Sequence, residues 1–231
     1  MKKYFVYMVL LFCVTVFAQE NEQRIYKFDY CTTSEKSGNI EYTLANSQNK
    51  DYFVYISCFK NEITTVLFDT KTNSQFVFNK IENQDINSIS INSLFNKPIK
   101  FDYSFNKNKP EDKYITTVED LDSLKKVNIK IYKNKRKKKL VSERNLYIKS
   151  HGKIKNNLFV THLIFAYKYD INQIKVEGIL VLDEVIYDNK IVQHYKLKDC
   201  IDINLSLTIN HDSTMIYSEI SSAGDIFRQK K

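Results

Sequence analysis

The chain has 231 residues, with 35 Lys and Arg against 27 Asp and Glu and a formal net charge of +8 at pH 7. That length is enough for one all-β domain, or for two small domains, with a sizeable core. Only four glycines and two prolines are present, which argues against glycine-rich phosphate loops and collagen-like repeats.

The first 18 residues have the pattern of a secretory signal. Met1–Lys3 is positively charged, Tyr4–Phe17 is almost wholly apolar, and Ala18 is a small residue at a suitable cleavage position. The apolar run is shorter than the roughly 20 residues that a membrane helix needs. We therefore expect residues 1–18 to be removed by cleavage after Ala18. Residues 19–231 should then form a single exported domain without a transmembrane segment, either periplasmic or secreted.

Hydrophobic alternation at period two runs through the rest of the chain, which is typical of strands with one dry and one wet face. In chain order, the predicted strands are Arg24–Thr33, Ile40–Ala45, Tyr52–Phe59, Ile63–Asp69, Gln75–Asn79, Phe101–Phe105, Val127–Ile131, Leu140–Lys149, Phe159–Tyr169, Ile174–Asp183, Ile191–Lys198 and Ile201–Ile209. Tyr52–Ile56 is apolar at every position. This predicts either a central strand covered on both faces or a strand that lines an apolar cavity.

Short polar connectors separate these strands at hairpin spacing. Lys36–Asn39, Thr70–Asn73, Asp170–Asn172 and Asp188–Asn189 contain Asn and Asp, which tolerate the positive φ angles of tight turns. One helix is predicted over Val118–Lys126, because acidic residues begin this segment and lysines end it, as a helix dipole favours.

These elements predict an all-β fold. We expect mainly an antiparallel meander in one curved, barrel-like or half-barrel sheet, with at most one or two short helices. The looser segment Ile81–Lys97 and the polar segment Asn106–Lys113 are expected to be long loops within that sheet. The pattern leaves open whether the sheet forms a sandwich, a closed barrel or a half barrel.

Three cysteines follow the signal, Cys31, Cys58 and Cys200. All three lie in apolar or β-branched stretches, which favours buried thiols over one disulfide with one cysteine left over. Cys13 lies inside the signal, where the large Phe12 before it disfavours a lipid attachment site. No cysteines or histidines have the spacing of zinc ligands, so we expect no metal and no cofactor.

A run of six cations in seven residues lies between the strands predicted at Val127–Ile131 and Leu140–Lys149, and is therefore expected at a hairpin tip. These candidate binding residues are Lys133, Lys135, Arg136, Lys137, Lys138 and Lys139. An exposed cationic tip suits the phosphates of lipid headgroups or lipopolysaccharide, or an acidic envelope protein. The alternative is a solvated turn whose charges discourage edge aggregation. The export signal argues against nucleic acid as a partner.

The four histidines are His151, His162, His194 and His211. Serine and aspartate neighbour two of them in sequence, but neighbouring residues on a strand point to opposite faces. No glycine elbow flanks a serine. A hydrolase is therefore the least favoured functional hypothesis, and we expect no enzymatic activity.

The features together favour an exported bacterial envelope protein that acts by binding. In the preferred form of this hypothesis, a concave sheet face holds an apolar or lipid-like ligand and the cationic tip assists. The alternative is a structural or protein-interaction module of the cell envelope or surface that binds no small ligand.

Overall fold

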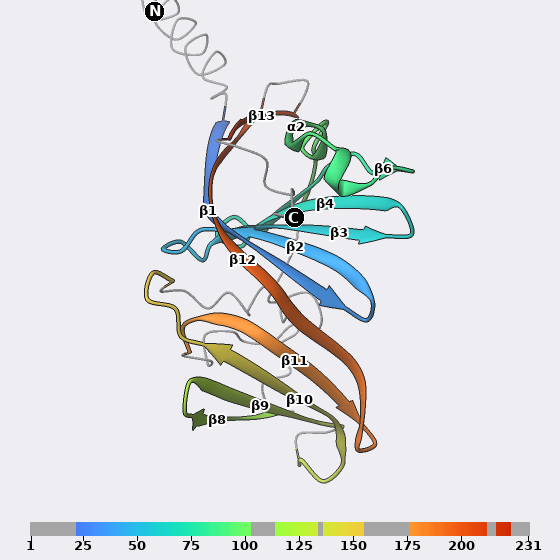
Figure 1. The fold of residues 1–231 in the computed structure, drawn as a ribbon, viewed down its shortest axis with the longest axis vertical. Helices are drawn as coiled ribbons and strands as arrows, with labels where there is room; N and C mark the ends of the chain where they lie inside the picture. Colours follow the sequence, from blue (N-terminus) through green and yellow to red (C-terminus); the bar gives the residue numbers. More distant parts are fainter. Residues whose placement is uncertain (1–21, 103–113, 134–135, 155–175, 212–215, 223–231) are drawn as a thin grey trace, which may run out of the picture.

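The described part of the chain folds as one antiparallel sheet. The computed structural model describes residues 22–102, 114–133, 136–154, 176–211 and 216–222, and 13 strands in it form a single sheet (Figure 1). The strands are β1 (Glu22–Lys36), β2 (Asn39–Ala45), β3 (Tyr52–Phe59), β4 (Glu62–Asp69), β5 (Ser74–Val77), β6 (Ile81–Glu82), β7 (Ile99–Asp102), β8 (Tyr114–Leu121), β9 (Leu124–Tyr132), β10 (Leu140–Lys149), β11 (Ile179–Tyr187), β12 (Lys190–His211) and β13 (Ile216–Ser222). A 3-10 turn, η1 (Ile86–Ser88), and one short helix, α2 (Ile91–Leu94), complete the described elements. The predicted fold class is confirmed.

The strand order is that of a meander with one long-range pairing. Across the sheet it is β7-β5-β4-β3-β2-β1-β12-β11-β10-β9-β8, with β13 also paired to β12 and β6 to β4. Most neighbours follow each other in sequence, as hairpins do, but β1 pairs with β12. Strands β1–β7 are termed the upper half and β8–β11 the lower half, and β12 runs through both (Figure 1). Within the described residues β7 and β8 do not pair with each other, so the sheet is open rather than a closed barrel.

Strand β12 is one strand of 22 residues, where the sequence predicted two, Ile191–Lys198 and Ile201–Ile209. The sequence pattern breaks inside this strand because β12 contains a bulge. The register of β1 against β12 passes over one residue of β12 between Thr33 and Ser34. Such an insertion moves the following odd-numbered side chains to the other face of the sheet. The apolar side chains of Ile201–Ile209 accordingly pack in the upper half, while Tyr195 packs in the lower half.

Both faces of the upper half carry apolar rows that cross the strands. On one face, facing residues of successive strands form the row Cys31, Leu44, Val54, Leu67 and Phe76. On the other face the row is Tyr30, Ala45, Phe53 and Phe68, and the last two rings stack with their centroids 5.0 Å apart. The prediction that the strand containing Tyr52–Ile56 is covered on both faces is therefore confirmed.

The lower half has one apolar face and one polar face. The buried cluster of its inner face comprises Val127, Ile129, Leu146, Ile148, Val176, Leu180 and Tyr195. The same face holds a buried ion pair in which Arg144 Nε donates to Asp183 Oδ1 at 2.6 Å and a second guanidinium N–H donates to Oδ2. On the outer face the Asn128 amide donates to Asn145 at 2.7 Å and also to the Glu143 carboxylate.

The predicted helix over Val118–Lys126 is wrong. This segment forms the hairpin between β8 and β9, and its turn contains Asp122 at a φ of +37°. The β-branched run Ile115–Val118 favours a strand because such side chains suit a pleated surface. The charges that suggested a helix dipole pair across the hairpin instead, with Lys125 Nζ 3.6 Å from Asp120 Oδ1.

Three of the four predicted turns lie among the described residues and are confirmed. Each holds residues with positive φ angles, which are Ser37 and Gly38, Asn73, and Asp188 and Asn189. All three described cysteines are free thiols, but only Cys31 is buried and the other two are half-buried, so the expectation of buried thiols is confirmed for Cys31 alone.

Several expectations concern residues outside the described part of the chain and stay predictions. They are the signal with its cleavage after Ala18, the loop Asn106–Lys113, the strand Phe159–Tyr169 and the turn Asp170–Asn172. Among the residues that the structure describes, no helix combines the length and apolar character needed to cross a bilayer.

Candidate functional site

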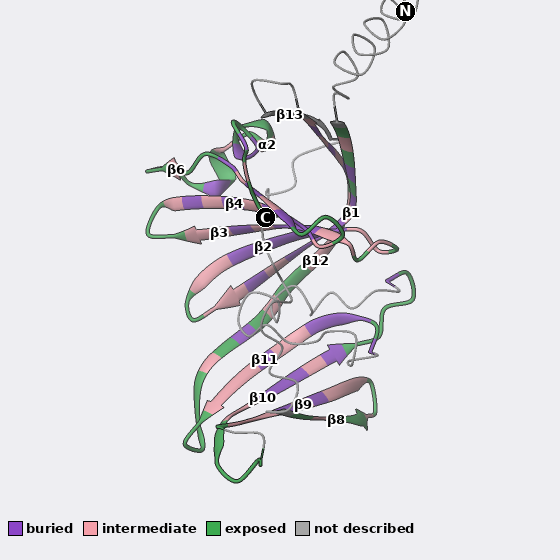
Figure 2. Cartoon of the chain, turned by 180° about the vertical axis from the view of Figure 1, so that it is seen from behind, coloured by how far each residue is buried: buried purple, intermediate pink, exposed green. Residues whose placement is uncertain are grey.

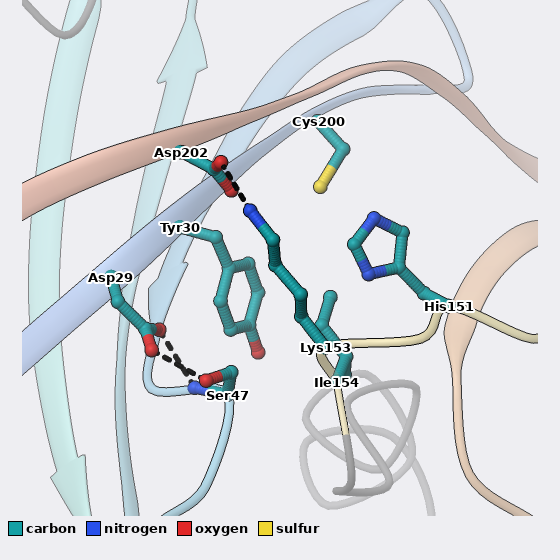
Figure 3. A pocket seen from close by; sticks show the side chains of 8 residues that line it. All are labelled: Asp29, Tyr30, Ser47, His151, Lys153, Ile154, Cys200 and Asp202. Atoms are coloured by element: carbon teal, nitrogen blue, oxygen red, sulfur yellow. Dashed lines mark hydrogen bonds and ion pairs between the residues drawn. The ribbon is translucent and has the colours of Figure 1, made fainter.

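A cavity of about 260 Å³ lies where the segment after β10 meets β1 and β12 (Figure 3). Its lining comes from β1, the loop after β2, the segment after β10, and β12. The lining residues are Asp29, Tyr30, Ser47, His151, Lys153, Ile154, Cys200 and Asp202. Most of these side chains carry polar groups, so the cavity suits a ligand that forms hydrogen bonds.

The pairing of β1 with β12 brings distant residues to this cavity. Tyr30 stands opposite Asp202, and a bulge lies beside it, because the register shifts between Phe28 and Tyr30. Neighbouring residues on a regular strand point to opposite faces, but a bulge re-aims side chains. Asp29 and Tyr30 consequently both point into the cavity (Figure 3).

Side-chain hydrogen bonds hold the loop after β2 against β1. The Ser47 backbone N–H donates to Asp29 Oδ1 at 2.7 Å, and its hydroxyl donates to Oδ2 at 2.5 Å. The Tyr52 hydroxyl accepts from the backbone N–H of Lys27 at 3.2 Å and donates to its carbonyl at 3.1 Å. These contacts replace a strand ladder along this edge of β1 and fix the position of the Asp29 carboxylate.

One contact within the segment after β10 and two contacts to other elements position this segment beside the cavity. The N–H of Ile154 donates to the carbonyl of His151 at 3.0 Å, which forms a turn. The Gln48 amide donates to the carbonyl of Lys153 at 3.0 Å, and Lys153 Nζ donates to Asp202 Oδ2 at 3.1 Å. These contacts place Lys153 and Ile154 beside β1 and β12.

The Tyr30 hydroxyl is a buried polar group without a hydrogen-bond partner among the described residues. The residue is only 2% exposed, and its hydroxyl points into the cavity (Figure 3). It has no hydrogen-bond partner within the described part of the chain. Burial and then the charge of Asp29 raise the pKa of Tyr30 well above its ordinary value, so the hydroxyl keeps its proton. It can therefore both donate and accept a hydrogen bond.

Cys200 and His151 both line the cavity, but the thiol lacks the character of a nucleophile. Burial and then the charges of Asp199 and Asp202 raise the pKa of Cys200 to about 11. The nucleophilic form of cysteine is the thiolate, which is scarce at neutral pH under these conditions. Across the described ranges, no three His, Cys, Asp or Glu side chains are placed to hold a metal ion.

Of the remaining histidines, only the side chain of His194 belongs to the described part of the chain. His194 is exposed on β12 and does not line the cavity. His162 lies outside the described residues, and His211 is the last residue of β12. The hydrolase hypothesis gains no support from this arrangement.

The cationic run lies where the sequence predicted it, at the tip of the hairpin between β9 and β10. The backbone N–H of Lys133 donates to the carbonyl of Lys139 at 2.9 Å and closes the tip. The exposed cations are Lys133, Arg136, Lys137, Lys138 and Lys139, whereas Lys135 lies outside the described residues. None of these five lines the cavity.

The hairpin between β11 and β12 ends beside the cationic tip. Glu143 of β10 pairs with Ile186 of β11, so both tips lie at the same end of the lower half, where both are exposed (Figures 1 and 2). Exposed apolar side chains accompany the cations there, namely Leu140, Val141, Tyr187, Ile191 and Val192. The two tips, comprising Lys133, Arg136–Val141 and Tyr187–Val192, are termed the hairpin end.

Sequence reasoning found the cationic tip but missed the cavity. Six adjacent cations are a local signal, whereas the cavity lining depends on the pairing of β1 with β12 and on the bulge beside Tyr30. Only His151 and Cys200 were singled out from the sequence, each for a different reason. No local signal marks the bulge, because Tyr26, Phe28 and Tyr30 alternate in the sequence without a break, and the shift appears only in the register of β1 against β12.

No protein-family model matches the chain, and a search of curated proteins also finds no match. Function is therefore inferred from the chemistry of the cavity and of the hairpin end.

Proposed function

We propose that this protein acts by binding, and that the hairpin end attaches it to an anionic lipid surface. The observation that carries this proposal is the meeting of exposed cations and exposed apolar side chains in two adjacent tips. Export through the signal at residues 1–18 is part of the proposal, since it would bring the protein to the cell envelope.

The cations of the hairpin end supply the electrostatic attraction. Lys190 in the second tip adds to the five exposed cations of the first, and Asp188 is the sole acid in the sequence of the two tips. Each Lys or Arg near an anionic leaflet contributes about 1 kcal/mol. Five such contacts correspond to a dissociation constant of about 0.2 mM, so charge alone gives weak binding.

The apolar side chains supply the additional affinity. Ile191 and Val192 are 57% and 60% exposed, although burying a whole aliphatic side chain is favourable by about 1.5–3 kcal/mol. Clustered exposed apolar residues mark interaction surfaces, and apolar groups beside cations are typical of proteins that lie at a membrane surface. Charge therefore brings the tip to the surface, and apolar insertion holds it there.

Two features of the described residues favour the hairpin end over a concave sheet face as the proposed lipid contact. In the upper half, Leu44, Val54 and Phe76 are completely buried by their neighbours. Most of the residues that line the cavity of Figure 3 carry polar or charged groups. Anionic headgroups at the tips thus fit the described residues better than an enclosed acyl chain.

Vesicle co-sedimentation tests this function. We expect the purified protein to sediment with vesicles containing phosphatidylglycerol but not with pure phosphatidylcholine vesicles. Added salt should weaken the binding, because screening shortens to about 3 Å at 1 M ionic strength. Equal binding to both kinds of vesicle, or no binding to either, would contradict the proposal.

Two double variants separate charge from apolar insertion. Lys137→Gln with Lys138→Gln should lower the affinity by about 30-fold, from about 1 kcal/mol for each charge. Lys71→Gln with Lys97→Gln is the matched control, because both lysines are exposed in turns of the upper half. Ile191→Ser with Val192→Ser should weaken binding while its salt dependence persists. An equal loss in the control would show that net charge, and not the hairpin end, determines binding.

A second candidate function is pairing with another chain at the edge of the sheet. Strand β7 ends the strand order, and its Ile99 and Phe101 side chains are exposed. Exposed apolar edge strands are templates for pairing with another strand. Light scattering should then show a dimer at high concentration that Phe101→Lys abolishes, and a monomer at all concentrations would exclude this alternative.

A further inference from the structure

We propose that the cavity in Figure 3 is a second binding site, which takes a small neutral ligand rich in hydroxyl groups and no larger than a single sugar ring. Its central contact is the Tyr30 hydroxyl. No residue of the hairpin end lines this cavity, so the inference does not depend on attachment to lipid.

The Tyr30 hydroxyl has no hydrogen-bond partner among the described residues. Leaving such a buried group unsatisfied is costly, and buried polar groups in native proteins almost always have a partner. The cavity measures about 260 Å³, whereas one water molecule occupies about 30 Å³ in the liquid. The space beside Tyr30 is therefore larger than a single bridging water requires.

The lining offers both donors and acceptors around this space. Asp29 and Asp202 present carboxylates, Lys153 presents an ammonium group, and His151 has an imidazole. A hydroxyl group both donates and accepts, so adjacent hydroxyls on one ligand can meet a carboxylate and an ammonium group at once. The two carboxylates disfavour an anionic ligand. Lys153 already forms an ion pair with Asp202, so a cationic ligand is not needed to balance that carboxylate.

The charged lining groups keep free capacity for a ligand. Each oxygen of Asp29 accepts one hydrogen bond from Ser47, although a carboxylate oxygen has about two acceptor positions. The side chains of Lys153 and Asp202 remain largely exposed. Ile154 adds an apolar wall, which suits the carbon–hydrogen face of a polyol.

The size and rigidity of the cavity set the scale of the ligand. Pockets for drug-sized molecules run from about 300 to 1,000 Å³, so about 260 Å³ suits a smaller molecule. The contacts that hold Asp29 and Lys153 in place reduce the entropy lost on binding. A single sugar ring or a short polyol fits both constraints.

Ligand-observed NMR on the purified protein tests the inference with D-glucose, N-acetyl-D-glucosamine and glycerol as neutral probes. Inorganic phosphate and L-lysine serve as charged probes. We expect saturable binding of at least one neutral probe and none of the charged ones. Tyr30→Phe should lower that affinity about 5- to 10-fold, which is the loss expected for one hydrogen bond.

Matched controls separate this site from general destabilisation. Tyr147→Phe removes a hydroxyl from β10 outside the cavity lining and should leave the affinity unchanged. Lys153→Gln should weaken binding, whereas Lys198→Gln, on β12 and paired with Glu35, should not. The melting temperature of Tyr30→Phe should not fall, because its hydroxyl has no partner to lose among the described residues.

Three outcomes would overturn the inference. Absence of saturable binding by every neutral probe would leave water as the partner of Tyr30. Binding of phosphate or lysine in place of the neutral probes would make the ligand class wrong. Unchanged affinity in both Tyr30→Phe and Lys153→Gln would place the binding elsewhere on the protein.

Discussion

The two halves of the sheet cover their strands in different ways. In the upper half, the adjacent residues Phe53 and Val54 of β3 lie in two different buried clusters, one on each face. In the lower half, Ile129 of β9 is buried in a cluster while its neighbour Lys130 is half-exposed. Continuous apolar runs therefore mark strands covered on both faces, and alternation marks strands with one wet face.

The two halves also differ in how they bury charge. The lower half buries Arg144 and Asp183 as a bidentate pair beside its apolar cluster. The upper half buries the Glu41 carboxylate, whose ion pair with Lys36 is long, with Nζ 3.9 Å from Oε1. A buried charge is tolerated when it is closely paired and is costly otherwise. The charge of Asp183 should thus stabilise the fold, whereas that of Glu41 should not.

The largest expected effects test whether strands are covered on both faces in the upper half and on one face in the lower half. Phe53→Ala should lower the free energy of unfolding by about 3–5 kcal/mol, and Val54→Ala by about 2 kcal/mol. Ile129→Ala should cost about 3 kcal/mol, but Lys130→Ala less than about 0.5 kcal/mol. Urea unfolding measures all four variants. Similar losses in Ile129→Ala and Lys130→Ala would remove the difference between the halves.

Breaking the buried ion pair should have the next largest effect. Asp183→Asn should cost about 3 kcal/mol, because it leaves the Arg144 charge buried without its carboxylate. The double variant Arg144→Met with Asp183→Leu should lose less than about 1 kcal/mol of stability, because it leaves no buried charge without a partner. Glu62→Gln is the control, since its pair with Lys80 is well exposed and contributes below about 1 kcal/mol. A double variant as unstable as Asp183→Asn would show that the pair is needed for more than charge balance.

A smaller effect is expected at the entry to β11. Gly178 has a φ of +137°, and an added Cβ would lie 2.3 Å from the carbonyl oxygen of Lys149. Gly178→Ala should therefore cost about 2 kcal/mol through backbone strain. Gly152→Ala should change little, because nothing lies within 4 Å of the position of its Cβ. Thermal unfolding of the two variants compares them directly, and equal melting temperatures would contradict the close approach.

The strands were predictable because alternation is a local property. The bounds predicted for Tyr52–Phe59 and Leu140–Lys149 coincide with those of β3 and β10. The helix over Val118–Lys126 was wrong because charge order at its two ends was weighed above the β-branched residues before it. Opposite charges at the two ends of a segment fit a two-stranded hairpin as well as a helix.

The cavity and the strand order could not be predicted in the same way. Both depend on the pairing of β1 with β12, which joins Tyr30 to Asp202 across most of the chain. Alternation shows which side chains share a face but does not show which strands are neighbours. The bulge near Tyr30 leaves the alternation of Tyr26, Phe28 and Tyr30 unbroken in the sequence, so its consequence for Asp29 appears only when the partner strand is known.

The smallest expected effect concerns the pH dependence of the upper half. Burial raises the pKa of Glu41, although a hydrogen bond from Tyr55 and the charge of Lys36 oppose this. The folded protein therefore holds a proton that the unfolded chain releases, and stability falls as pH rises from about 4.5 through the raised pKa. Glu41→Gln should be more stable than the wild type at pH 7, by at most about 1 kcal/mol. That difference should vanish near pH 4.

Glu35, on the neighbouring strand β1, supplies the control of opposite sign. A hydrogen bond from Lys198 and then its charge lower the pKa of Glu35, so its stabilising contribution is present at neutral pH and lost as pH falls through that lowered pKa. Glu35→Gln should thus be slightly less stable than the wild type at pH 7. Unfolding curves at pH 4 and pH 7 should separate the two variants in opposite directions. Parallel curves would show that burial does not raise the pKa of Glu41, and the contrast with the paired charges of the lower half would then fail.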